Sequence, residues 1–187
     1  MSTVASHPGV VTPEELLRMP DSVGYELVNG QLVERHASME SSRIGTRICN
    51  LLSIEAVRTG ECTVYNADLG YRCFADDPNR IRKPDVSAIR KGRLAALGAG
   101  DRGYCPIPAD LAIEVVSPND LYNEVFDKVQ EYLGAGFGVI WVVAPQRKVV
   151  TVYRQDGTIA LVQQNQQITV EPAFTSLRLQ VADFFAE

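Results

Sequence analysis

The sequence predicts one mixed α/β domain with a strand–helix–strand crossover at its centre. Its 187 residues suit a single domain with a sizeable core. Two nearly continuous apolar runs, at residues 111–116 and 139–143, are typical of strands buried on both faces. A helical segment between them, capped by residues 117–120 and running to about Leu133, would join them as parallel strands through a right-handed crossover.

An N-terminal helix and a hairpin precede this core. Thr12 is a suitable cap for a short helix with Pro13 in its first turn, and Asn29-Gly30 suits a type I′ turn between strands at 25–28 and 31–34. The other expected elements are a helix at 41–58, strands at 62–65, 69–74, 85–89, 149–153 and 159–163, a last strand near Leu177 in the same mixed sheet, and a helix at 181–185. Residues 1–11 are expected to be flexible, and 91–109 to be irregular with one helical turn.

Composition excludes several classes of protein. No apolar run is long enough to span a bilayer, and the N-terminus lacks the pattern of a secretory signal. The four cysteines are far apart, without a CxxC pair, and the chain has only two histidines, so neither a zinc site nor a disulfide framework is expected. We expect a cytoplasmic protein with reduced, buried thiols, no membrane association and no small-molecule cofactor.

Charge is unevenly distributed along the chain. The net charge of −5 argues against a strongly basic, non-specific nucleic-acid binder. Residues 80–93 nevertheless carry six basic side chains against one acid, Asp85. Such a stretch is compatible with phosphate contacts, although a solvated charged loop is the commoner explanation. The candidate DNA-binding residues are Arg82, Lys83, Arg90, Lys91 and Arg93.

Glu114 is the most unusual residue in the chain. It lies within a strand that should be covered on both faces, where a carboxylate costs several kcal/mol unless a cation or a set of donors meets it. Two interpretations are open. Glu114 is either part of a functional site or the partner of an arginine in a structural salt bridge.

Asp85 and Lys128 are candidates for the same site. Pro84 places Asp85 at the very start of a strand. On the helix after Glu114, the spacing of Leu121, Val125, Lys128 and Tyr132 assigns Lys128 to the inward face or its edge. The alternative for Lys128 is a surface ion pair with Glu124 at i,i+4.

Two carboxylates and a lysine suit metal-dependent phosphodiester hydrolysis. Asp85 and Glu114 would hold Mg²⁺ or Mn²⁺, hard cations that prefer oxygen ligands, and the carbonyl of Val115 could be a further ligand. The metal would polarise the phosphoryl group and acidify a bound water, while Lys128 would stabilise developing charge.

The order of several motifs resembles one known family. These motifs are Lys-Pro-Asp-Val around Asp85, Ile-Glu-Val-Val-Ser-Pro-Asn around Glu114, the helix from Glu124 to Tyr132, Gly-Ala-Gly-Phe-Gly-Val-Ile-Trp-Val-Val after it, the N-terminal Tyr-Glu-Leu-Val-Asn-Gly-Gln-Leu, and the C-terminal segment 174–185. Over nearly the whole chain, the sequence resembles the Uma-two family of endonucleases, which is similar to a branch of the PD-(D/E)XK nuclease superfamily.

The resemblance implies a restriction-endonuclease-like fold with Asp85 and Glu114 as metal ligands. The superfamily's lysine usually lies two residues after the second acid, where this chain has Val116, so the resemblance implies that Lys128 takes its place. It also implies that Glu26 is an accessory acid, and the alternative is an exposed hairpin residue. Members of the family often carry a histidine where this chain has Ser41.

We therefore expect a Mg²⁺-dependent DNA endonuclease with Asp85, Glu114, Lys128 and Glu26 in its active site. The competing hypothesis is a catalytically weakened nuclease-fold module that binds DNA or protein, which the substitutions at Ser41 and Val116 favour modestly. A third hypothesis is a structural protein in which Glu114 and Lys128 pair without metal. A symmetric homodimer is expected because enzymes that cut both strands often pair two sites.

Overall fold

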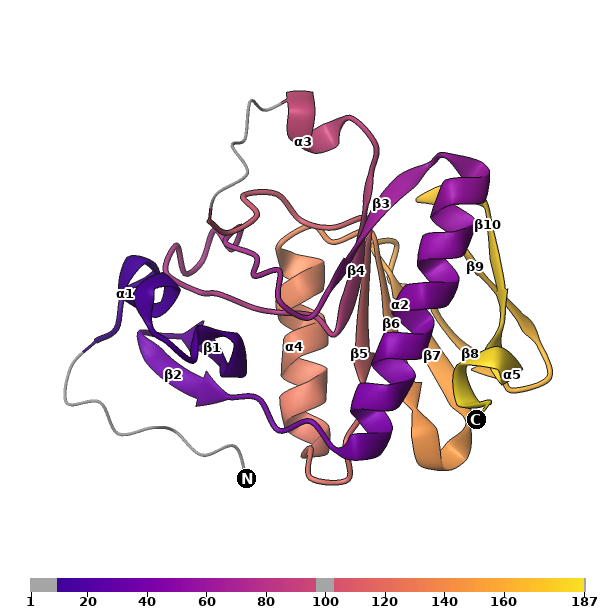
Figure 1. Cartoon of the computed structure of the whole chain (residues 1–187), viewed down its shortest axis with the longest axis horizontal. Helices are drawn as coiled ribbons and strands as arrows, with labels where there is room; N and C mark the ends of the chain where they lie inside the picture. Colours follow the sequence, from indigo (N-terminus) through magenta and orange to yellow (C-terminus); the bar gives the residue numbers. More distant parts are fainter. Residues whose placement is uncertain (1–9, 97–102, 187) are drawn as a thin grey trace.

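A six-stranded mixed sheet forms the centre of the computed structural model, which describes residues 10–96 and 103–186 (Figure 1). The strand order is β3-β4-β5-β6-β7-β8, with β5 and β6 parallel and the other neighbours antiparallel. The predicted mixed α/β class is confirmed. The strands are β3 (Cys62–Asn66), β4 (Val86–Arg90), β5 (Leu111–Val115), β6 (Val139–Ala144), β7 (Val149–Arg154) and β8 (Ile159–Gln163).

Two helices cover opposite faces of this sheet. Helix α2 (Met39–Thr59) packs on one face and α4 (Tyr122–Gly134) on the other, as Figure 1 shows. Successive side chains of β5 alternate between the faces, since Ile113 joins the core cluster of α2 and Ala112 that of α4. Glu114 is two residues after Ala112 in the strand, so its side chain lies on the same face as that of Ala112, the α4 face.

The N-terminal segment forms the predicted helix and hairpin. Thr12 caps α1 (Pro13–Arg18) by accepting a hydrogen bond from the backbone N–H of Glu15. Strands β1 (Tyr25–Val28) and β2 (Gln31–Glu34) are joined through Asn29 and Gly30, whose φ angles of 52° and 74° suit a type I′ turn. A bridge between Leu27 and Ile81 joins this hairpin to the segment that precedes β4. Two short 3₁₀ turns are η1 (Ser22–Gly24) and η2 (Pro145–Arg147).

The C-terminal segment differs from the prediction. The last strand, β10 (Phe174–Gln180), does not extend the central sheet but pairs with β9 (Gln167–Val170), which was not predicted, in a separate two-stranded sheet. The reason is packing, because Phe174 and Leu177 join the core cluster on the α2 face. The terminal helix α5 (Val181–Phe185) was predicted and packs on the same cluster.

Three further expectations require correction. Residues 69–74 form no named strand, because only Tyr71 makes isolated bridges, to Arg82 and Cys105. The turn at 117–120 does not cap α4, since the Asp120 carboxylate accepts a hydrogen bond from the N–H of Ser117 and the helix begins later, at Tyr122. Helix α2 begins at Met39, two residues earlier than predicted, behind a capping box of Ser38 and Ser41.

Other expectations concern the connections and the cysteines. The helical turn expected in 91–109 is α3 (Arg93–Ala96), whereas residues 97–102, like 1–9 at the N-terminus, lie outside the described part of the chain. All four cysteines have free thiols, two of them buried and two half-buried. None of the helices within residues 10–96 and 103–186 is long and apolar enough to cross a membrane.

Candidate active site

A cavity of about 650 Å³ lies between the N-terminal hairpin, the first turns of α2 and the N-terminal half of α4. It is placed at the carboxyl end of β5 and the amino end of β4, where neighbouring antiparallel strands begin and end together. The structure brings the predicted catalytic residues to this one cavity. Among the residues that line it are Glu26, Arg35, Asp85, Glu114, Val115 and Lys128.

Asp85 lies immediately before β4 and has donors at both carboxylate oxygens. Oδ2 accepts a 2.8 Å hydrogen bond from the backbone N–H of Val115, and Oδ1 accepts one of 2.9 Å from Nη2 of Arg35. Burial raises the pKa of Asp85, although the Arg35 charge opposes the shift. The hydrogen bond from Val115 brings the backbone of this residue beside Asp85. The carbonyl of Val115 stays a predicted metal ligand.

Glu114 is buried, and its side chain is directed toward α4. Oε1 accepts a 2.7 Å hydrogen bond from the hydroxyl of Tyr132, and Oε2 lies 3.4 Å from Nζ of Lys128. Burial raises the pKa of Glu114 to about 7, helped by the nearby charges of Asp85 and Glu26 and opposed by Lys128. The ion-pair partner that the structure gives Glu114 is a lysine of the candidate site, not the arginine of the alternative interpretation.

Lys128 faces inward from α4, as the helical spacing predicts. Its Nζ lies 3.2 Å from Glu26 and 3.4 Å from Glu114, and only 21% of its side chain is exposed. Val116 lies in the apolar cluster on the α4 face, so the position of the superfamily's lysine is filled by a hydrophobic side chain. Lys128 reaches that face of the sheet from the helix that covers it.

Glu26 is buried, with 1% exposure, so its interpretation as an exposed hairpin residue is wrong. Oε1 accepts a 2.8 Å hydrogen bond from the N–H of Lys83, while Oε2 accepts one of 2.8 Å from Arg82 and pairs with Lys128. Burial alone would raise the pKa of Glu26, but the charges of Lys128, Arg82 and Arg35 outweigh it and lower the pKa to about 2. Glu26 therefore holds the side chains of Arg82 and Lys128 in place.

The predicted DNA contacts at Arg82 and Lys83 require correction, because both residues are buried. Arg82 makes two hydrogen bonds to Glu131, of 2.6 and 2.9 Å, besides its bond to Glu26. Nζ of Lys83 donates to the carbonyl of Ser22. Arg82 therefore neutralises Glu26 and Glu131, and the Lys83 ammonium is held by a backbone carbonyl, so these two side chains form neither an open phosphate-binding surface nor part of a solvated loop.

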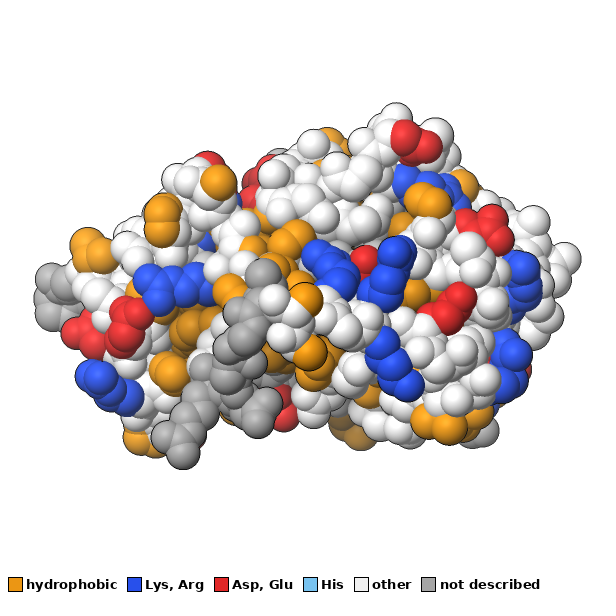
Figure 2. All heavy atoms as spheres, turned by 90° about the horizontal axis from the view of Figure 1, so that it is seen from above, with side chains coloured by type: hydrophobic (Ala, Val, Ile, Leu, Met, Phe, Trp, Pro, Cys, Tyr) orange, Lys and Arg blue, Asp and Glu red, His pale blue; other side chains and the backbone are white. Residues whose placement is uncertain are grey.

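The other predicted contacts, Arg90, Lys91 and Arg93, lie at the far end of β4, roughly 17 Å along the strand from Asp85. Arg90 donates to the carbonyl of Ala173, and Arg93 pairs with Asp110 at 2.6 Å. On the face seen in Figure 2, basic side chains are interspersed with acidic and uncharged ones. Arg90, Lys91 and Arg93 therefore do not form one continuous basic surface with the cavity.

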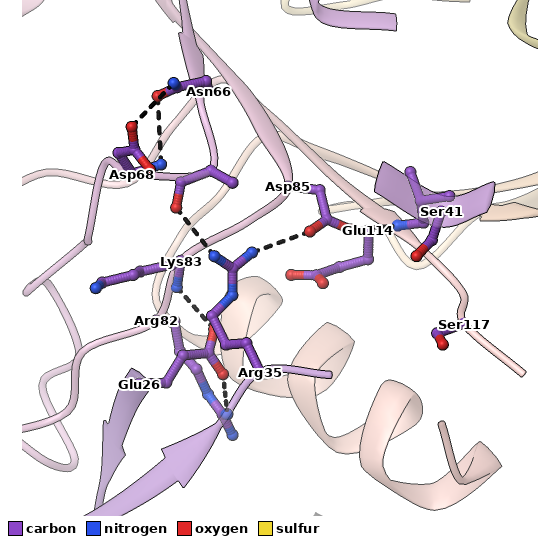
Figure 3. A network of polar contacts seen from close by, with 12 residues as sticks. Glu26, Arg35, Ser41, Asn66, Asp68, Arg82, Lys83, Asp85, Glu114 and Ser117 are labelled. Carbon is purple, nitrogen blue, oxygen red and sulfur yellow. Dashed lines mark hydrogen bonds and ion pairs between the residues drawn. The ribbon is translucent and has the colours of Figure 1, made fainter. Parts of the chain in front are cut away.

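The cavity's donor set fits a hard divalent cation. No cluster of three or more His, Cys, Asp or Glu side chains that could hold a metal exists in the described part of the chain. Mg²⁺, however, is usually held by one or two carboxylates and completes its shell with water and substrate phosphate. Asp85 and Glu114 supply two such carboxylates, close enough for the charge of Asp85 to raise the pKa of Glu114, and Figure 3 shows them side by side.

Sequence reasoning missed Arg35 and the capping role of Ser41. Arg35 follows β2, and its guanidinium points at Asp85 (Figure 3), although no local pattern marks this contact across 50 positions. Ser41 is buried and lines the cavity where the family often has histidine. Its hydroxyl accepts a hydrogen bond from the N–H of Ser38, and the Ser38-x-x-Ser41 spacing could have indicated this capping box.

Comparisons with known proteins identify the fold and the family of the chain. No curated protein matches the chain. A crystal structure of a "putative nuclease belonging to DUF820" from Anabaena variabilis superposes with a TM-score of 0.76, over 94% of this chain and 97% of that one, at 19% identity. Such a likeness shows a shared fold. The profile of the Uma2 family, described as "Putative restriction endonuclease", matches residues 13–182, and the chain therefore belongs to the Uma2 family.

Proposed function

We propose that this Uma2 protein is a metal-dependent endonuclease that hydrolyses phosphodiester bonds in DNA. The observation that carries the proposal is the convergence of Asp85, Glu114 and Lys128 on one cavity, from the residue before β4, from β5 and from α4. The first two supply oxygen ligands for Mg²⁺ or Mn²⁺, and the third is a cation within reach of the same acids.

Each residue of the cavity has a distinct part in this reaction. A bound Mg²⁺ would polarise the phosphoryl group and supply an acidified water. Asp85 and Glu114 would hold the ion, and Lys128 would place a positive charge where negative charge develops on the phosphate. Glu26 is a positioning residue, because its carboxylate lies 3.2 Å from Nζ of Lys128 and anchors it.

Substrate and assembly are further parts of the proposal. Family membership supports a nucleic acid as the substrate, and we propose DNA. Cleavage of both strands would be served by a symmetric homodimer that pairs two cavities. The free thiols of all four cysteines support a cytoplasmic location.

A nicking assay on supercoiled plasmid tests the enzymatic function. Wild-type protein should nick the plasmid with Mg²⁺ or Mn²⁺ and should not with EDTA. Asp85→Asn or Glu114→Gln should abolish nicking, and Lys128→Met should lower the rate by about 100-fold or more. Asp156→Asn, in an exposed turn remote from the cavity, is the matched control and should cut normally.

The alternative is a weakened module that binds DNA or protein. The pairing of Arg35 with Asp85 and the use of Ser41 as a helix cap favour it, because neither feature contributes a catalytic group. The absence of nicking by wild-type protein, together with the absence of calorimetric Mn²⁺ binding, would establish this alternative over the endonuclease. Activity that survives all three substitutions would overturn the site assignment.

A further inference from the structure

Arg35 forms an ion pair with Asp85, whose carboxylate is a proposed metal ligand. Its Nη2 lies 2.9 Å from Oδ1 of Asp85, and its Nη1 donates to the carbonyl of Ala67 at 3.2 Å. Figure 3 shows the guanidinium between these two partners, with the carboxylate of Glu114 beside it. Arg35 therefore neutralises Asp85, and both residues line the cavity.

The three cavity cations are held very differently. Arg82 makes charged hydrogen bonds of 2.6 to 2.9 Å to two acids, Glu26 and Glu131. Lys128 lies between two buried acids, Glu26 and Glu114. Arg35 has one acid and one neutral carbonyl, and it belongs to the connection between β2 and α2 rather than to either element. Arg35 is thus the one of these three cations that pairs directly with a single acid.

A metal at Asp85 would compete with Arg35 for the same carboxylate. Arg35, Arg82 and Lys128 already pair with the carboxylates of Asp85, Glu26 and Glu114. A divalent ion would add two positive charges to a largely buried group of side chains. Like charges repel more strongly in such a partly desolvated site than in water, because its effective dielectric constant is lower. The guanidinium of Arg35 would be repelled most, because it would share the Asp85 carboxylate with the metal.

We propose that Arg35 is an internal competitor of the divalent cation, which occupies Asp85 in the metal-free protein and gives it up when the metal binds. This inference rests on the proposed function, because it requires Asp85 to be a metal ligand. It assigns to Arg35 the regulation of metal affinity at that site. Removing the guanidinium should therefore tighten metal binding, whereas the loss of an ordinary structural contact would weaken or preserve it.

Calorimetric titration of the full chain with MnCl₂, without DNA and at fixed pH and salt, tests the inference. Arg35→Met, which keeps an unbranched apolar side chain and removes the charge, should lower the Kd for Mn²⁺ by about tenfold or more. Arg93→Met is the matched control, because Arg93 also pairs with an aspartate, Asp110, but outside the cavity. Its Kd should equal that of wild-type protein.

A second measurement uses wild-type protein and so does not depend on the folding of Arg35→Met. In an Mg²⁺ titration followed by NMR, the Nε–Hε signal of Arg35 should shift and saturate together with metal binding. The corresponding signal of Arg82 should move little, because its two acids hold it. An Arg35 signal that stays constant while the site fills with Mg²⁺ would overturn the inference.

The outcomes separate the two proposals. Equal Mn²⁺ affinity in wild type and Arg35→Met, or weaker binding in the variant, overturns the competitor role and leaves the metal-dependent endonuclease standing. Absence of Mn²⁺ binding in wild type but clear binding in Arg35→Met supports the competitor role in its strongest form. Absence of binding in both proteins overturns the metal site itself, and with it the proposed function.

Discussion

The hydroxyl of Tyr132 on α4 donates a 2.7 Å hydrogen bond to Oε1 of Glu114 on β5. This bond ties the helix that carries Lys128 to the strand that carries the second proposed ligand. It also lowers the pKa of Glu114, against burial and the neighbouring acids that raise it. Tyr132 is therefore a positioning residue for the candidate site.

Tyr132→Phe should consequently affect both stability and pH dependence. We expect a loss of about 1–3 kcal/mol in the free energy of unfolding, because a buried acceptor loses its donor. The pKa of Glu114 should rise, so the nicking rate should reach its plateau at a higher pH. Tyr71→Phe is the matched control, since the equally buried Tyr71 hydroxyl donates to Ser87 at 2.7 Å. It should cost similar stability without shifting the pH profile.

Metal binding should release a proton from Glu114. Its pKa of about 7 means that the carboxyl is mostly protonated at pH 6, and a cation must displace that proton. Mn²⁺ affinity should fall by about tenfold for each pH unit well below 7 and level off above it. Calorimetry at pH 6 in two buffers of different ionisation enthalpy measures the protons released. Release of close to zero protons per bound Mn²⁺ at pH 6 would contradict this account of Glu114.

Glu26 should stabilise the fold in a pH-dependent way. Its folded pKa of about 2 lies below the ordinary value of 4.5, so its contribution is complete above pH 4.5 and is lost as the pH falls toward 2. The advantage of wild-type protein over Glu26→Gln, measured by urea unfolding, should shrink by about 1 kcal/mol between pH 6 and pH 3.5. A constant difference over that interval would show that ionisation of Glu26 does not stabilise the fold.

Two glycines near the ends of α4 and β6 should respond oppositely to alanine. A Cβ at Gly138 would lie 2.7 Å from the backbone oxygen of Asp110, so Gly138→Ala should destabilise the protein by about 2 kcal/mol or more. A Cβ at Gly134, in the last turn of α4, would meet nothing within 4 Å. Gly134→Ala should be neutral or stabilise by up to about 1 kcal/mol. Thermal unfolding measures both changes.

Local patterns predicted most of the elements because neighbouring residues decide them. Asn29 and Gly30 adopt the positive φ angles that their turn requires, whatever lies around them. The apolar run in β5 made Glu114 conspicuous, and helical periodicity alone placed Lys128 on the inward face. The pairing of β9 with β10 was missed, because it depends on apolar surface that α2 and the sheet present only after folding.

The basic stretch shows most clearly where the sequence was insufficient. Arg82 and Arg90 are eight positions apart and identical in type, yet one is buried against two acids and the other is exposed. The acids that decide this, Glu26 and Glu131, are 56 and 49 positions away from Arg82. Nothing within the stretch itself distinguishes a residue that holds the site together from one on the surface.

The sequence by itself predicted the two buried strands and the helix between them, the family resemblance, and the acids and the lysine of the candidate site. Only the tertiary structure decided which charges meet: Lys128 with Glu26 and Glu114, and Arg35 with Asp85. The physical reason is that helices and turns depend on residues a few positions apart. Electrostatic energy depends instead on distance and burial, and both are set by segments that are remote in the chain until it folds.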